Sequence, residues 1–214
     1  MQFSGMVHVI DDDDALRESL LFLLGAAKLE TRVYASAEAF LANMSGAEPG
    51  CIITDVRMPG ITGLELLRRL KKSQAAFPVI VISGHADVPL AVEAMKLGAV
   101  EFLEKPFEED ALLSAVHAAL NKHARDSQRE LERSTIDERI ATLSQRQRQV
   151  LQGLVAGHPN KTIAFDLGIS PRTVEIYRAN VMTKMQATSL SDLVRMALVA
   201  GLLSDAAAPS SSSG

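Results

Sequence analysis

The first 122 residues alternate between two hydrophobic periods. Short apolar or β-branched runs, typical of buried parallel strands, occupy residues 6–10, 31–34, 51–54, 77–84 and 101–104. Between and after these runs, apolar residues recur every three or four positions, which predicts helices over residues 15–27, 36–41, 61–72, 88–97 and 108–122. Five such alternations predict a five-stranded, doubly wound parallel sheet with helices on both faces, and they are too few for an eight-stranded barrel.

The hydrophobic pattern changes twice in the rest of the chain. Residues 123–142 are rich in Arg, Glu, Asp and Gln and contain few large apolar residues, so we expect a solvated helical linker that adds no second core. Helical periodicity then returns and predicts an all-α domain of four helices over residues 143–204. Residues 205–214, rich in Ala and Ser, predict a flexible tail. Two domains are therefore expected, over 1–122 and 143–204.

The composition is that of an ordinary globular protein. Hydrophobic residues make up 47% of the chain and charged residues 22%. No apolar run approaches the ~20 residues that cross a bilayer, and the N-terminus lacks the basic and apolar regions of a signal peptide, so no membrane partner is expected. Cys51 is the single cysteine and forms no disulfide framework, which favours a reducing cytoplasm.

The net charge of −4 is unevenly distributed. Residues 1–125 hold 12 basic and 17 acidic side chains, whereas residues 126–214 hold 10 and 9. An acidic first part suits a metal or phosphate site, and a mildly basic second part suits contact with nucleic acid. The imbalance is too small to identify either site by itself.

Three carboxylates stand at the ends of two strands that should be neighbours in the sheet. Asp11 and Asp12 follow the first strand, and Asp55 ends the third. Ligands of open parallel sheets bind at this edge, and clustered carboxylates favour a hard cation such as Mg²⁺ (or Mn²⁺). Asp can also attack phosphorus to form an aspartyl phosphate. Ser83 and Lys105, at the ends of the fourth and fifth strands, offer a hydroxyl and a cation to phosphoryl oxygens.

These residues also have plainer explanations. Helix capping explains Asp13 and Asp14 whatever the function, since acidic side chains in a first turn favour the helix dipole. A single Ser or Lys at a strand end is usually a surface residue, and His85 is interpreted as a loop histidine because no partner is defined for it. A functional site is favoured because four features stand at four strand ends in one consistent order.

Residues 5–122 resemble the receiver domain of bacterial two-component response regulators. The matching residues are Ile10-Asp11-Asp12, Asp55 with Met58-Pro59-Gly60, Ser83-Gly84 and Lys105-Pro106-Phe107. The resemblance implies a flavodoxin-like receiver fold with Asp55 as the phosphoacceptor. It also implies that Asp12, Asp55 and the backbone carbonyl of Arg57 bind Mg²⁺, while Asp11 acts mainly through a metal-bound water.

The same resemblance implies how the domain responds to phosphorylation. Ser83 closes on the phosphoryl group, and Lys105, which precedes a cis peptide bond to Pro106, pairs with it. Phe102 stands at the switch position, where the family often has Tyr. Because Phe lacks a hydroxyl, its inward turn would rest on packing alone.

One predicted helix near the C-terminus suits the DNA major groove. Val174, Tyr177, Val181 and Met185 recur at steps of three and four and should face the core. The opposite side mixes small, apolar and polar groups between basic flanks, a pattern that lets the face meet base edges and the flanks meet phosphates. The candidate DNA contacts are Arg172, Thr173, Glu175, Ile176, Arg178, Ala179, Asn180 and Lys184. The alternative is an ordinary amphipathic helix with a solvated face.

Residues 143–203 resemble the four-helix LuxR-type helix-turn-helix domain of the NarL/FixJ response regulators. The matching strings are Leu143-Ser144-x-Arg146-x-x-x-Val150-Leu151, Gly157-His158-Pro159-Asn160-Lys161 and Ser170-Pro171-Arg172-Thr173-Val174-Glu175. The resemblance implies promoter double-stranded DNA, RNA polymerase and a sensor histidine kinase as partners. Within this family, the members that this chain most resembles imply a FixL-like, haem-based oxygen-sensing kinase and activation of nitrogen-fixation or microaerobic genes.

These inferences combine into one hypothesis with two rivals. Phosphorylation of Asp55 would reshape the face made by Val88–Leu97 and Glu101–Leu103, which dimerises in the family, and the dimer would bind a two-fold symmetric operator. No turnover of a separate substrate is expected. One rival is a phosphotransfer hydrolase with an aspartyl intermediate, although such enzymes usually carry a second Asp where this chain has Arg57. The other keeps the receiver but gives the second domain an RNA or protein target.

Overall fold

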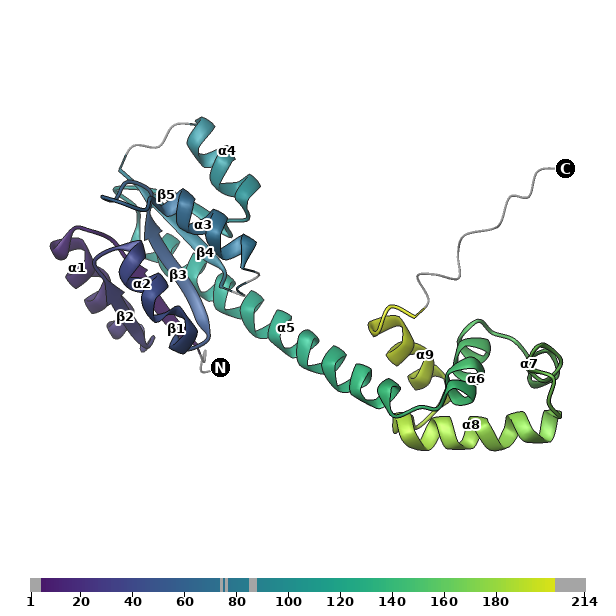
Figure 1. The fold of residues 1–214 in the computed structure, drawn as a ribbon. Helices are drawn as coiled ribbons and strands as arrows, with labels where there is room; N and C mark the ends of the chain where they lie inside the picture. Colours follow the sequence, from purple (N-terminus) through teal and green to yellow (C-terminus); the bar gives the residue numbers. More distant parts are fainter. Residues whose placement is uncertain (1–4, 74, 76, 85–87, 203–214) are drawn as a thin grey trace, which may run out of the picture. The chain divides into compact units, whose positions relative to one another are not determined.

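The computed structural model describes residues 5–73, 75, 77–84 and 88–202 (Figure 1). The chain divides into two compact units, residues 1–127 and 128–214. The predicted tail lies outside the described residues. Within the described part of the chain, no helix combines the length and apolar character needed to cross a membrane.

The N-terminal unit contains a five-stranded parallel sheet, as predicted. The strands are β1 (Met6–Ile10), β2 (Thr31–Tyr34), β3 (Gly50–Asp55), β4 (Val79–Ser83) and β5 (Glu101–Glu104), in the order β2-β1-β3-β4-β5. The register places Ile10 opposite Thr54 and Asp55 opposite Ile82. The carboxyl ends of β1, β3 and β4 therefore meet at one edge of the sheet, which is where the candidate site was expected.

Helices cover both faces of the sheet, which confirms the doubly wound architecture (Figure 1). One face packs against α1 (Asp14–Ala26) and the beginning of α5 (Glu109–Ala141), the other against α2 (Ala37–Asn43), α3 (Gly63–Lys72) and α4 (Val88–Leu97), with a short 3-10 helix, η1 (Met44–Gly46), after α2. β1, β3 and β4 are buried along their whole length, as expected of strands covered on both sides.

Side-chain caps fix where the helices of this unit begin. Asp13 accepts hydrogen bonds from the backbone N–H groups of Ala15 (2.9 Å) and Leu16 (3.4 Å), which confirms its capping role. Ser36 and Thr62 cap α2 and α3 in the same way. Each helix therefore starts directly after the loop that leaves the carboxyl end of a strand.

The region expected to be a solvated linker differs from that expectation. α5 continues without a break from the N-terminal unit through residues 123–141. Near its end Ile136 is only 2% exposed and packs into the core of the second unit, with Ile140 partly buried against it. Two widely spaced isoleucines in a charged segment form no periodic stripe, so the sequence pattern did not reveal this contribution to the core.

The C-terminal unit is all-α, as predicted. Its further helices are α6 (Gln145–Val155), α7 (Asn160–Leu167), α8 (Pro171–Met185) and α9 (Leu190–Val199). Val150, Leu151, Val174 and Val181 lie in its core. Gly168 ends α7 in the left-handed conformation (φ 65°), and Ser170 then caps α8, so the two helices are joined by a short turn.

Candidate functional site

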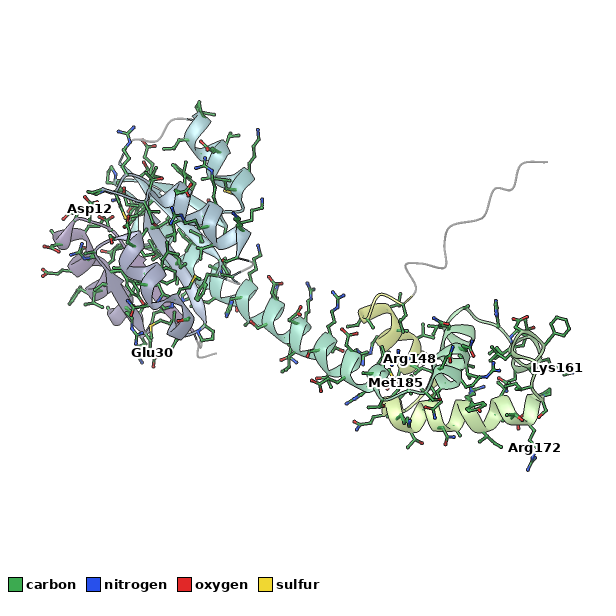
Figure 2. The ribbon with its side chains drawn as sticks, in the orientation of Figure 1. Asp12, Glu30, Arg148, Lys161, Arg172 and Met185 are labelled. Carbon is green, nitrogen blue, oxygen red and sulfur yellow. The ribbon has the colours of Figure 1, made fainter. Side chains whose placement is uncertain are left out.

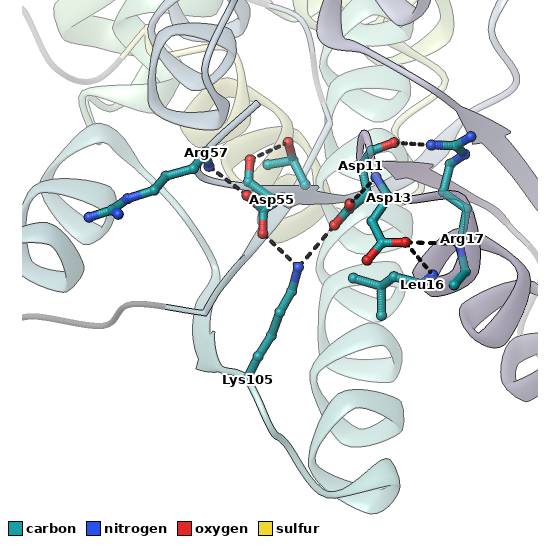
Figure 3. Close-up of polar contacts among 9 residues, drawn as sticks. Asp11, Asp13, Leu16, Arg17, Asp55, Arg57 and Lys105 are labelled. Carbon is teal, nitrogen blue, oxygen red and sulfur yellow. Dashed lines mark hydrogen bonds and ion pairs between the residues drawn. The ribbon is translucent and has the colours of Figure 1, made fainter. Parts of the chain in front are cut away.

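The buried carboxylates of the N-terminal unit converge on one lysine. Asp11 follows β1, Asp55 ends β3 and Lys105 follows β5. The Lys105 Nζ lies 2.6 Å from Asp55 Oδ1 and 3.0 Å from Asp11 Oδ2 (Figure 3). Of the side chains predicted to gather at this edge of the sheet, Asp11, Asp55 and Lys105 are in direct contact.

Burial shapes the electrostatics of this cluster. Asp11 is 1% exposed and Asp55 7%. Burial raises the pKa of the Asp11 carboxyl above its usual range, against the opposite effect of hydrogen bonds from the Asp13 N–H and Lys105. Burial also disfavours the charge of Lys105, but its hydrogen bonds to Asp55 and Asp11 outweigh that effect and raise its pKa. A charged ammonium group is therefore held beside the Asp55 carboxylate.

Backbone groups orient both carboxylates. The Arg57 N–H donates to Asp55 Oδ2 at 2.5 Å, and the Asp13 N–H donates to Asp11 Oδ1 at 2.9 Å. Arg17 also braces the first loop. Its Nη1 donates to the Asp11 carbonyl at 2.5 Å (Figure 3), and its guanidinium pairs with Asp14. The sequence pattern did not single out Arg17, since an arginine near the start of a helix is usually solvated.

Asp12, unlike Asp11 and Asp55, is exposed, and Figure 2 shows it at the surface of the unit. Among the described residues, no three His, Cys, Asp or Glu side chains form a group that could hold a metal ion. Asp11 and Asp55 nevertheless fit a divalent cation, because both already contact one cationic group and carboxylate and carbonyl oxygens are the donors that Mg²⁺ prefers.

The other residues that the resemblance implicates lie on β4, on β5 and directly after β5. Ser83 is buried at the end of β4, and its carbonyl accepts a hydrogen bond from the Lys105 N–H at 2.8 Å. Phe102, on β5, is partly buried against the core that α2, α3 and α4 share. The peptide bond between Lys105 and Pro106 is cis, as the resemblance implied. His85 lies outside the described residues.

The exposed face of α8 matches the predicted face. Val174, Val181 and Met185 are buried and Tyr177 is partly buried, so the predicted core stripe is confirmed. Exposed positions on this helix include Arg172, Glu175, Ile176, Ala179, Asn180 and Thr183. Ile176 is 57% exposed, and Figure 2 shows Arg172 directed away from the helix. α8 therefore offers a face of mixed chemistry that a macromolecule can contact.

Two of the candidate DNA-contacting side chains form hydrogen bonds within the C-terminal unit. The Lys184 Nζ donates to the Thr142 carbonyl at 2.9 Å and to Gln147 Oε1 at 3.0 Å, so its ammonium group ties α8 to the turn before α6. The Thr173 hydroxyl lies 2.8 Å from the Ser170 hydroxyl, within the cap of α8. Sequence spacing could not show these contacts, because it places a residue on a helix face without specifying its neighbours. Arg178 is partly buried on its flank of the helix.

Each of the two units matches the model of a known protein family. Residues 7–117 match the model of the response regulator receiver domain, and residues 141–197 match the model of bacterial regulatory proteins of the luxR family. These ranges contain every candidate residue named above.

Curated relatives match over nearly the whole chain. The chain is 62% identical to the transcriptional regulatory protein FixJ of Azorhizobium caulinodans, over 92% of this chain and 93% of that protein. It is 53% identical to the FixJ protein of Bradyrhizobium diazoefficiens, over 96% of this chain and 100% of that protein. It is also 40% identical to the response regulator protein TodT of Pseudomonas putida, over 90% and 85% of the two chains.

Solved structures match as well. The low-resolution structure of the response regulator StyR aligns with a TM-score of 0.80 at 39% identity, covering 91% of this chain and 98% of that one. Full-length FixJ from B. japonicum aligns with a TM-score of 0.59 at 53% identity, covering 94% and 100% of the two chains.

Proposed function

We propose that Asp55 is the phosphoacceptor of this chain, which belongs to the two-component response regulators that join a receiver domain to a LuxR-type DNA-binding domain. Members of this family are transcriptional regulators rather than metabolic enzymes, and a histidine kinase and DNA are the partners that such domains imply. The observation that carries the proposal is the position of the Lys105 ammonium, 2.6 Å from the Asp55 carboxylate at the edge of the sheet.

The proposed transfer step uses the side chains of this site. An Asp55 carboxylate oxygen attacks the phosphorus of a phosphohistidine on the kinase; a P–O bond forms, the P–N bond breaks, and the histidine ring leaves. Lys105 then pairs with a phosphoryl oxygen. Asp11, Asp12 and Asp55, with the Arg57 carbonyl, would hold Mg²⁺ (or Mn²⁺), which supplies positive charge to the phosphoryl oxygens when bound.

A switch then carries the signal to the face formed by Val88–Leu97 and Glu101–Leu103. Ser83 moves toward the phosphoryl group and leaves space that Phe102 fills by packing. We propose that this face then forms a homodimer. Exposed apolar side chains on α4, among them Val88 at 77%, support the proposal, because they would gain from burial in a dimer.

The dimer presents two copies of α8 to a two-fold symmetric promoter site. We propose that five residues on the exposed face of α8 contact bases or phosphates: Arg172, Glu175, Ile176, Ala179 and Asn180. Thr173, Arg178 and Lys184 lie at the borders of this face. The 62% identity to a FixJ protein supports a FixL-like kinase as phosphodonor, RNA polymerase as the further partner, and activation of nitrogen-fixation or microaerobic genes. A DNA target also supports our proposal of a cytoplasmic location.

Phosphorylation is tested by mass spectrometry after treatment with acetyl phosphate and Mg²⁺. We expect the wild type to gain the mass of one phosphoryl group and Asp55→Asn to gain none. Size-exclusion chromatography of the same samples should show a dimer only for the phosphorylated wild type. An adduct that survives Asp55→Asn contradicts the assignment of Asp55, and a monomer in all samples contradicts the dimer switch.

The target of the second domain is tested by mobility shift. Promoter DNA and RNA of equal length are compared with the phosphorylated protein. We expect a shift with DNA alone, because the outer face of α8 suits a major groove, whereas the deep, narrow groove of an RNA helix admits no side chains. A stronger shift with RNA supports the rival target.

A further inference from the structure

Glu38 lies in the first turn of α2 but contacts the loop between β3 and α3. Its Oε1 accepts a hydrogen bond from the Ile61 N–H at 2.7 Å. α2 is fixed in place by Ala37 and Phe40, which are fully buried in the core, and by the Ser36 cap. A rigid element therefore presents this carboxylate to a loop that is distant in the sequence.

The loop is shaped to receive the carboxylate. Gly60 has a φ of +75°, a conformation that favours glycine, and a Cβ atom there would collide with Glu38 Oε1. Hydrogen bonds from its own N–H and from the Ile61 N–H lower the pKa of Glu38. Glu38 is therefore ionised at neutral pH, and its hydrogen bond to the loop is charge-assisted.

This loop begins at the phosphoacceptor. The Val56 N–H donates to the Ile82 carbonyl at 3.0 Å, and the Gly63 N–H donates to the Val56 carbonyl at 3.1 Å, so backbone contacts hold both ends of the loop. Between these ends, the Arg57 N–H donates to Asp55 Oδ2 at 2.5 Å. The orientation of the Asp55 carboxylate thus depends on the path of the loop, which Glu38 restrains at Ile61.

We propose that Glu38 is a positioning residue of the phosphoacceptor site. By holding the loop at Ile61, it keeps the Asp55 carboxylate and the Arg57 carbonyl oriented for the phosphoryl group and the divalent cation. Glu38 touches no reacting atom and acts through the backbone, by preorganisation of the site. The inference rests on the proposed phosphorylation of Asp55.

The test compares three variants of the full chain. Glu38→Ala removes the acceptor, Glu38→Gln keeps an acceptor oxygen without the charge, and Glu48→Ala removes an exposed glutamate that pairs with Arg32 away from the site. For each we measure the rate of phosphorylation by acetyl phosphate, the Mg²⁺ dissociation constant by calorimetry, the Tm, and amide hydrogen exchange of the loop. Glu38→Ala should be phosphorylated about tenfold more slowly, bind Mg²⁺ more weakly and exchange the Ile61 amide faster.

Glu38→Gln should recover most of the lost rate, and Glu48→Ala should match the wild type in all four measurements. A Glu38→Ala protein with the wild-type rate and Mg²⁺ affinity overturns the positioning role. So does a rate loss at Glu38→Ala that simply follows Tm across the three variants, since that is the result of a purely structural role. If the wild type itself takes no phosphoryl group, the proposed function fails, whereas Mg²⁺ affinity and Ile61 exchange still decide whether Glu38 holds the loop.

Discussion

The two units place their candidate functional residues in opposite environments. In the N-terminal unit Asp11, Asp55 and Ser83 are buried at the edge of the sheet, whereas in the C-terminal unit Arg172 and Ile176 are exposed on α8. Interactions between charges are stronger where water is excluded, so reacting groups gain from burial. Residues that recognise a large partner must instead be accessible before it binds. A substitution at the first site should therefore alter stability and chemistry together, and one on the outer face of α8 should alter binding alone.

The contrast between the two units holds only if each unit unfolds separately. Large core substitutions test this separation. Phe40→Ala should lower the free energy of unfolding of the N-terminal unit by about 3–5 kcal/mol, and Leu151→Ala that of the C-terminal unit by about 2–5 kcal/mol, because each leaves a cavity in its own core. Differential scanning calorimetry measures both transitions. Each variant should shift one transition; a common shift of both would show that the units are energetically coupled.

The outer face of α8 is tested by charge-matched arginine substitutions. Arg172→Ala should weaken promoter binding by about 1–3 kcal/mol and change stability by less than about 0.5 kcal/mol. Arg133→Ala removes the same charge from an exposed ion pair on α5 and should leave affinity unchanged. Fluorescence anisotropy with labelled DNA gives the affinities. Equal losses for both variants would mean that the helix face contributes only net charge.

Lys184 separates the effect on stability from the effect on DNA binding, because it lies on α8 but forms hydrogen bonds within its own unit. Lys184→Met removes the hydrogen bonds to Thr142 and Gln147 and should lower the free energy of unfolding of the C-terminal unit by about 1 kcal/mol. Promoter affinity, measured at a temperature where the variant is folded, should stay close to that of the wild type. A loss of affinity without a loss of stability would return Lys184 to the DNA-contacting residues.

The smallest effect concerns pH. Burial lowers the pKa of His8 below its ordinary value of 6.5, and its Nε2 lies 2.9 Å from the Glu48 carbonyl. Because the unfolded chain binds a proton at His8 more readily than the folded one, the N-terminal unit should lose stability as pH falls through 6.5 toward the lower folded-state pKa. His8→Phe, which fits the ring cluster of Tyr34, Phe40 and Phe77, should lose this part of the slope. Urea unfolding at pH 7.5 and 5.5 measures it, and an unchanged slope in His8→Phe would contradict the assignment.

Hydrophobic periodicity was sufficient to predict most of the architecture. β1, β2, β5 and α4 have the predicted bounds, because each is a run of one period closed by a turn or a polar segment. The order of polar residues at the strand ends also predicted the meeting of Asp11, Asp55 and Lys105, since parallel strands bring their carboxyl ends to one edge.

Hydrophobic periodicity did not reveal contacts between residues that no period relates. Ile136 enters the core of the second unit from a charged segment, and Lys184 is held by two partners from the turn before α6 and from α6. The sequence order alone also could not show that Asp11 is buried while the adjacent Asp12 is exposed.

Local pattern was thus enough for the strands, the helices and the list of residues able to do the chemistry, because periodicity and strand-end position are properties of short segments. Folding in three dimensions decided which of those residues touch. It brought Lys105 within hydrogen-bond distance of Asp55, formed the hydrogen bond between Ile61 and Glu38, and placed the Arg17 guanidinium against the Asp11 carbonyl. These contacts arise from the packing of whole elements against one another, and spacing along the chain carries no record of that packing.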